Sequence, residues 1–119
     1  MADHVYWILE VTIKDGELDS FTTLMKEMTA ATENDELGTL NYEWWLSDDK
    51  NTCHIYERYV DSAATMLHLG NFGSKFAERF MSCVDPTRFV VYGNASNEIK
   101  EALVAFGPVY MQPFGGFGR

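Results

Sequence analysis

The sequence predicts an α+β domain whose elements follow the order β-α-β-β-α-β. In some segments apolar and aromatic residues alternate along the chain, as in half-buried strands, and in others they recur every three or four residues, as in helices with one buried side. Turn-forming residues separate these segments. With 119 residues the chain suits one domain. We expect residues 1–119 to form a single unit, with a core at about 4–92 and an extra C-terminal helix and tail at about 93–119.

The first strand is expected from His4 to Lys14. Its alternation predicts one buried side made of Val5, Trp7, Leu9, Val11 and Ile13. Asp15-Gly16 is a turn signal, after which Asp19 or Ser20 is expected to cap a helix that runs to about Glu33. Apolar residues at three-and-four spacing give this helix a buried stripe: Phe21, Leu24, Met25 and Met28.

Two further strands, at residues 40–46 and 52–59, are expected to pair as a hairpin across the polar turn 47–51. Trp44 and Trp45 are neighbours on one strand, so they must face opposite sides of the sheet. Asp61 is placed to cap the next helix, which carries His68 and is expected to stop at Gly70-Asn71.

The remaining helices and strand are predicted mainly from residues that begin or end such elements. A short helix is expected from about Gly73 to Cys83 and should end at Asp85-Pro86, because the residue before a proline disfavours helical backbone. A fourth strand follows at residues 87–92. Ser96 is expected to cap a last helix that stops at Gly107-Pro108, before a tail of glycines and aromatic residues.

This order is that of the ferredoxin-like split βαβ arrangement, an antiparallel sheet with helices on one face. The other sheet face is predicted to carry several aromatic side chains, and an apolar sheet face requires cover. We therefore expect a homodimer in which two such faces pack together and enclose a pocket.

Composition excludes several classes of function. The formal net charge is −9 and the lysines and arginines form no cluster, which argues against nucleic acid and anionic membranes as partners. The N-terminus lacks a signal-peptide pattern and Cys53 and Cys83 lack metal-type spacing, so we expect a soluble cytoplasmic protein with reduced thiols. The scattered His4, His54 and His68 predict no metal site.

Four short segments resemble the antibiotic biosynthesis monooxygenase (quinol monooxygenase-like) domain: Gly38-Thr39-Leu40-Asn41-Tyr42, Ile55-Tyr56-Glu57-Arg58-Tyr59, Ala63-Ala64 and His68. The resemblance covers roughly residues 5 to 92. It implies a dimeric α+β barrel, and an oxygenase that uses no cofactor and joins dioxygen to a quinol, phenolic or anthrone-like aromatic molecule. Haem degradation, found in a related branch, is not expected, because the first strand lacks the asparagine that branch needs.

The resemblance also selects candidate residues. It implies His68 and Glu57 as the catalytic pair; the second histidine of many members is replaced here by the region of Asn71 and Phe72. A neutral His68 imidazole suits a general base, and the alternative is a structural, hydrogen-bonded histidine. Glu57 either anchors its strand or pairs with His68. The candidates for contact with substrate are Tyr6, Glu10, Tyr42, Trp44, Tyr56, Asn71 and Phe72.

Alternatives stay open at this point. Tyrosines and tryptophans such as these candidates more often pack in the core or at a dimer interface than contact a substrate, and Glu10 equally suits a solvated strand position. The whole protein equally suits a dimeric module that binds a small molecule or acts in a stress response without catalysis, or a structural dimer whose own aromatic side chains fill the pocket.

Overall fold

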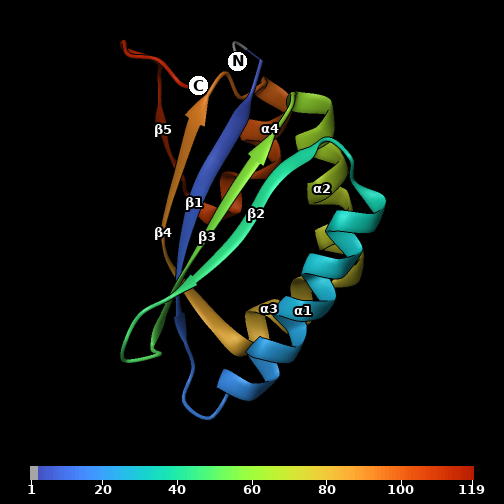
Figure 1. Cartoon of the computed structure of the whole chain (residues 1–119), viewed down its shortest axis with the longest axis vertical. Helices are drawn as coiled ribbons and strands as arrows, with labels where there is room; N and C mark the ends of the chain where they lie inside the picture. The colour runs from blue at the N-terminus through green and yellow to red at the C-terminus, as the bar shows by residue number, and fades with distance from the viewer. Residues whose placement is uncertain (1–2) are drawn as a thin grey trace.

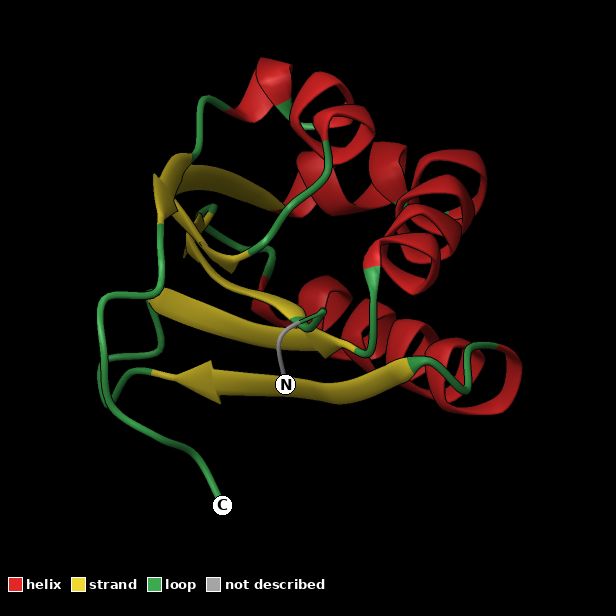
Figure 2. Cartoon of the chain, turned by 90° about the horizontal axis from the view of Figure 1, so that it is seen from above, coloured by secondary structure: helices red, strands yellow, loops and turns green. Residues whose placement is uncertain are grey.

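A computed structural model of the chain describes residues 3–119. Its helices cover one face of a five-stranded sheet (Figures 1 and 2). The strands are β1 (Val5–Ile13), β2 (Thr39–Leu46), β3 (Thr52–Tyr59), β4 (Val84–Gly93) and β5 (Val109–Met111). The helices are α1 (Leu18–Asp35), α2 (Ser62–Lys75), α3 (Ala77–Cys83), α4 (Asn97–Ala102) and the 3-10 turn η1 (Val104–Phe106). None of the helices in this described part is long and apolar enough to cross a membrane.

The sheet has the strand order β2-β3-β1-β4-β5. Its first four strands pair antiparallel, and the short β5 joins the edge of β4 in parallel. The predicted α+β, ferredoxin-like fold is therefore confirmed, with one strand added from the segment expected to be a tail. The alternation expected for β1 is also confirmed, since Val5, Trp7, Leu9, Val11 and Ile13 are all buried.

The predicted capping residues of two helices, α2 and α4, are confirmed. The Asp61 side chain accepts a hydrogen bond of 2.8 Å from the amide of Ala64, and the Ser96 hydroxyl accepts one of 3.2 Å from the amide of Ile99. The expectation for α1 was wrong, because the cap residue is Glu17 and Asp19 lies within the first helical turn. A carboxylate there still favours the helix through the helix dipole.

Two predicted element ends are wrong. Helix α2 continues through Gly70 and Asn71 to Lys75 and gives way to α3 at Phe76, whose backbone leaves helical geometry at φ −128°. Strand β4 begins at Val84 and passes through Asp85-Pro86. The register of β4 against β1 shifts beside Pro86, and such irregular positions are where a strand accepts proline.

Gly38 brings the start of β2 close to helix α2. A Cβ atom added at Gly38 would lie 2.6 Å from the Cβ atom of Ala64, closer than real side chains approach. The Gly38 carbonyl also accepts a 2.9 Å hydrogen bond from the amide of Val60, two residues before α2. This close approach sets the segment that precedes β2 against the side of α2 that carries His68.

Candidate active site

Three side chains form a row across the covered face of the sheet. Glu57 on β3 lies opposite Tyr42 on β2 and opposite Trp7 on β1 in the strand register. Because paired residues of neighbouring strands share one face, all three point toward the helices. Glu57 therefore lies between two aromatic side chains on the buried side of the sheet, where it is only 5% exposed.

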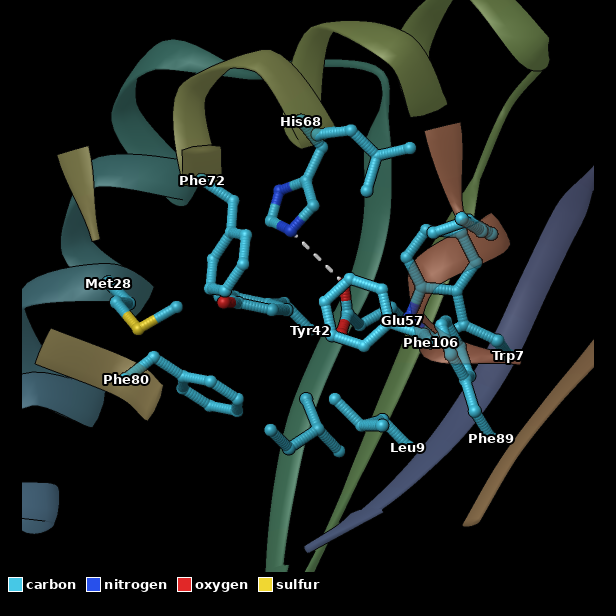
Figure 3. A pocket seen from close by; sticks show the side chains of 13 residues that line it. Trp7, Leu9, Met28, Tyr42, Glu57, His68, Phe72, Phe80, Phe89 and Phe106 are labelled. Atoms are coloured by element: carbon cyan, nitrogen blue, oxygen red, sulfur yellow. Dashed lines mark ion pairs between the residues drawn. The ribbon is translucent and has the colours of Figure 1, made fainter. Parts of the chain in front are cut away.

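His68 reaches this row from α2. Its ring is buried, with Nε2 at 3.1 Å from Oε1 of Glu57 (Figure 3). The Tyr42 and His68 rings meet in a T-shaped arrangement with their centres 5.3 Å apart. The predicted alternative in which Glu57 pairs with His68 is the arrangement observed.

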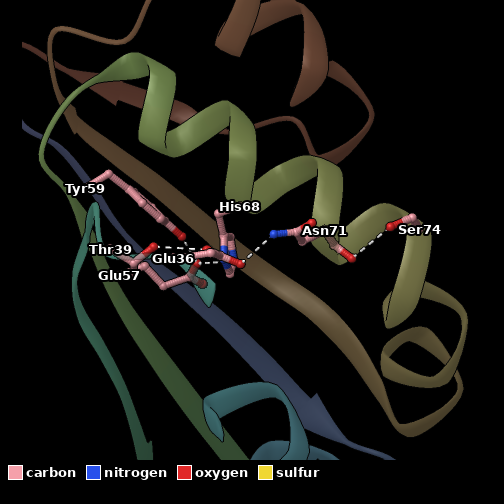
Figure 4. Close-up of polar contacts among 7 residues, drawn as sticks. All are labelled: Glu36, Thr39, Glu57, Tyr59, His68, Asn71 and Ser74. Carbon is pink, nitrogen blue, oxygen red and sulfur yellow. Dashed lines mark hydrogen bonds and ion pairs between the residues drawn. The ribbon is translucent and has the colours of Figure 1, made fainter. Parts of the chain in front are cut away.

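A second carboxylate, Glu36, contacts the other imidazole nitrogen. Oε1 of Glu36 lies 2.8 Å from Nδ1 of His68 and accepts a 3.0 Å hydrogen bond from the hydroxyl of Thr39. Oε2 of Glu36 accepts a 3.1 Å hydrogen bond from Nδ2 of the Asn71 side chain. The buried hydroxyl of Tyr59 donates to Oε1 of Glu57, which extends the chain of polar contacts shown in Figure 4.

Sequence reasoning missed Glu36 and Tyr59. The first helix was expected to end at about Glu33 and the next strand to begin at residue 40, so Glu36 falls in a connecting segment, yet it is only 5% exposed. The one signal nearby was Gly38, whose close approach to α2 brings this segment against the helix. Tyr59 belongs to one of the segments that resemble the monooxygenase family. Strand alternation alone does not reveal the partner of its hydroxyl group.

The contacts of His68 determine its protonation. Burial alone would lower the pKa of His68, but hydrogen bonds and charge from Glu36 and Glu57 outweigh burial and raise the pKa to about 9. The imidazolium form therefore predominates at pH 7, in contrast to the neutral base expected from the sequence. Burial acts to raise the pKa of Glu36, but His68, Asn71 and Thr39 together hold it below its usual value.

The two tyrosines near the carboxylates keep their protons. Burial first, and then the charge of Glu57, raises the pKa of both Tyr42 and Tyr59 well above the usual value. Both are therefore neutral hydroxyl groups at pH 7, able to donate hydrogen bonds.

These side chains surround a narrow cavity between the sheet and the helices (Figure 3). A water-sized sphere can move through about 40 Å³ of it. Its lining is almost entirely apolar and aromatic, and comprises Trp7, Leu9, Met28, Tyr42, Ile55, Glu57, His68, Leu69, Phe72, Phe80, Phe89, Leu103 and Phe106. Leu103 and Phe106 come from the C-terminal extension, which therefore supplies one wall.

The structure brings only some of the predicted site residues together. His68, Glu57, Tyr42 and Phe72 line the cavity. Asn71 lies beside it and holds Glu36. Trp44 packs in the core, its ring 5.6 Å from that of Phe21, so it is the helix-side tryptophan, whereas Trp45 is 61% exposed on the opposite face.

Tyr6, Glu10 and Tyr56 lie on the opposite face of the sheet, away from His68. The Tyr6 ring stacks on that of Tyr92 at 5.5 Å, and Glu10 lies 3.1 Å from His54. The expectation that one pocket between two sheets holds these residues together with His68 was wrong. The cavity at His68 is formed inside one chain, because the buried side of strand β3 faces the helices.

The sequence model of the antibiotic biosynthesis monooxygenase family matches residues 5–75. The chain belongs to this family. No curated protein matches the chain.

Similar solved structures support the fold. MupZ from Pseudomonas fluorescens is 20% identical with a TM-score of 0.86, and the match covers 98% of this chain and 95% of MupZ. SnoaB, a cofactor-independent oxygenase from Streptomyces nogalater, is 15% identical with a TM-score of 0.67 over 81% of this chain and 97% of SnoaB. A conserved protein from Methanosarcina mazei Go1 is 14% identical with a TM-score of 0.68, over 78% of this chain and 94% of that protein. The MupZ match, at 98% of the chain, extends over the α4–β5 segment.

Proposed function

We propose that the protein is a cofactor-independent monooxygenase that joins dioxygen to an electron-rich aromatic molecule, of the quinol, phenol or anthrone type. The observation that carries this proposal is the Glu57–His68 pair at the wall of an aromatic cavity. Family membership supports the reaction class, and the aromatic lining suits a flat ring.

The chemistry starts with removal of a proton from the substrate. The resulting anion is rich enough in electrons to reduce dioxygen directly, so all the electrons that reduce dioxygen come from the substrate. One oxygen atom joins the substrate carbon and the other leaves as water. The protein supplies a positioned proton acceptor, the orientation of the ring and the exclusion of bulk water.

Charge in the cavity favours a ligand that donates a hydrogen bond. The two carboxylates and the imidazolium sum to one net negative charge in surroundings that are mostly apolar. An anionic ligand would be repelled there, whereas a neutral hydroxyl group can donate to Glu57. The substrate therefore enters as a neutral phenol or enol.

Binding of a ring requires the cavity to widen. The space of about 40 Å³ that a water-sized sphere can explore is small beside the roughly 300–1,000 Å³ of typical ligand sites. The side chains of Phe72, Leu103 and Phe106 on the helical side are the ones expected to move. A second candidate function, in which the protein binds a small aromatic molecule without turning it over, needs the same widening.

Oxygen consumption separates these functions. We expect the wild-type protein to raise oxygen uptake with menadiol or an anthrone above the spontaneous rate. The Glu57→Gln variant should lose about 10²- to 10⁴-fold of this rate, as for removal of a general base. The Glu10→Gln variant makes the same chemical change on the opposite face and should keep the full rate. Ligand-induced thermal stabilisation without oxygen uptake would instead support the binding module.

The open face of the sheet supports a homodimer. It exposes Trp45, which is 61% accessible, and carries the stacked Tyr6 and Tyr92. An aromatic sheet face of this kind is commonly covered by a second subunit. Size-exclusion chromatography with light scattering should give twice the chain mass at micromolar concentration, and a monomer there would reject the dimer.

The cysteines support a location in the cytoplasm. Cys53 and Cys83 are buried as separate thiols, and burial raises the pKa of Cys53 to about 11, which keeps it unreactive. Thiols of this kind are common in reducing compartments. Fractionation of cells that produce the protein would test the location.

A further inference from the structure

The two oxygens of Glu57 have different surroundings. Oε1 accepts the hydroxyl of Tyr59 and lies 3.1 Å from Nε2 of His68. Within the described residues, Oε2 takes part in no hydrogen bond. Figure 3 shows Glu57 at the centre of the side chains that line the cavity. Oε2 is not among the enclosed polar atoms that lack a partner, so it borders the space of the cavity that Glu57 lines. A ligand hydroxyl group in the cavity can therefore donate a hydrogen bond to it.

Both ring nitrogens of His68 face carboxylate oxygens, at 2.8 Å and 3.1 Å. An ionised carboxylate only accepts hydrogen bonds, and a neutral imidazole donates from one nitrogen alone. A neutral ring would therefore turn a lone pair toward one of the two carboxylates. The doubly protonated ring satisfies both.

We propose that Glu36 is a positioning residue that, together with Glu57, keeps His68 doubly protonated, so that the proton acceptor of the cavity is the free oxygen of Glu57 and not the imidazole. The part of this inference that concerns proton transfer rests on the proposed monooxygenase function. The titratable groups that face His68 and its carboxylate partners come from three segments: Glu36 before β2, Tyr42 on β2, and Glu57 with Tyr59 on β3.

This arrangement keeps the charge of the site constant during the first step. The substrate O–H bond breaks and an O–H bond forms at Oε2 of Glu57, so the carboxylate becomes neutral as the substrate becomes an anion. His68 stays positive because Glu36 still pairs with it at 2.8 Å. The imidazolium then lies near the new anion and stabilises it. Without Glu36, the loss of charge on Glu57 would leave the buried imidazolium with the substrate anion as its one counter-charge, so its proton could pass to that anion.

Nuclear magnetic resonance of the histidine side chains tests the protonation directly. The chain has three histidines, so a His68→Gln spectrum assigns the His68 signals. We expect the wild-type His68 to titrate near pH 9. In Glu36→Gln the midpoint should fall by about one pH unit or more, since one charge-assisted hydrogen bond is lost. Glu33→Gln, which removes the same charge from an exposed position on α1, should leave the midpoint unchanged.

A wild-type midpoint near the ordinary value of 6.5, or one that Glu36→Gln does not move, overturns the inference. If Glu36→Gln fails to fold, the wild-type titration and Glu36→Asp still decide it. The dependence of kcat/KM on pH gives a second readout: it should fall as pH rises through the His68 midpoint, whereas a rise there would make the neutral imidazole the base. Absence of any turnover would reject the proposed function alone, because the titration is measured without substrate.

Discussion

The two faces of the sheet carry the same kind of contact in opposite surroundings. On the covered face, Nε2 of His68 lies 3.1 Å from Glu57, and the two side chains are 6% and 7% exposed. On the open face, Nε2 of His54 also lies 3.1 Å from Glu10, but these side chains are 49% and 34% exposed. The distance between the nitrogen and the carboxylate oxygen is the same in both pairs, so the pairs differ in access to water.

Access to water decides what each pair contributes. Water screens the exposed pair, and such pairs contribute little to stability. In the buried pair, hydrogen bonds between the two side chains replace hydrogen bonds to water, so each side chain depends on its partner to remain charged. We therefore expect changes on the covered face to alter stability strongly, and the matching changes on the open face to alter the stability of the single chain only slightly.

The largest expected effect is that of His68→Ala. Removing the ring leaves Glu36 and Glu57 buried without their cation, and loss of one partner of a buried ion pair costs about 3–5 kcal/mol of unfolding free energy. Urea denaturation followed by circular dichroism would measure it. A cost below about 1 kcal/mol would show that the carboxylates simply take up protons and that the cluster is not an ionic unit.

The dependence of stability on pH comes next. The pKa of His68 rises from 6.5 to about 9 on folding, so its contribution is complete below pH 6.5 and is lost as pH rises through 9. At about 1.4 kcal/mol for each pH unit, this amounts to roughly 3 kcal/mol. Glu36 acts in the opposite direction, because its lowered pKa adds stability that is lost on acidification below its usual range.

The difference in unfolding free energy between wild type and His68→Gln, measured from pH 6 to pH 10, isolates this contribution. We expect the difference to shrink as pH rises. A constant difference would mean that His68 binds no extra proton in the folded protein.

Removal of one hydroxyl group from each face is expected to give a smaller difference in stability between the two faces. Tyr59→Phe deletes a buried donor to Glu57 and should cost about 1–3 kcal/mol. Tyr56→Phe, on the open face, should change stability by less than about 0.5 kcal/mol. Thermal denaturation of both variants measures the contrast, and equal effects would contradict it.

The smallest expected effect is that of His54→Ala. For the isolated chain the change should stay within about 0.5 kcal/mol, because the His54–Glu10 pair is exposed. A larger loss that grows with protein concentration would show that a second subunit covers this face. Chemical denaturation at several protein concentrations distinguishes the two results.

Residues close together in the chain allowed most of the fold to be predicted. The alternation from Val5 to Ile13 identified the buried side of β1, and Asp61 and Ser96 marked helix starts through hydrogen bonds to their own first turns. The misplaced ends have a different origin. Gly70 continues α2 and Pro86 lies within β4 because packing and a register shift outweigh local preference at those positions.

The candidate site was predicted only in part for the same reason. His68 and Glu57 belonged to segments that resembled a family, so the sequence indicated both residues. Glu36 and Tyr59 enter the site through contacts that sequence spacing does not reveal, with Glu36 lying 32 positions before His68.

The sequence by itself determined the order of the elements through β4 and the buried side of β1, because both depend on neighbours along the chain. The central histidine was indicated by the resemblance to a family. Only the tertiary structure decided that the site lies inside one chain, that a second carboxylate joins it and that the histidine carries a charge. Burial and proton affinity depend on which groups exclude water from one another, and that is settled when distant segments pack together.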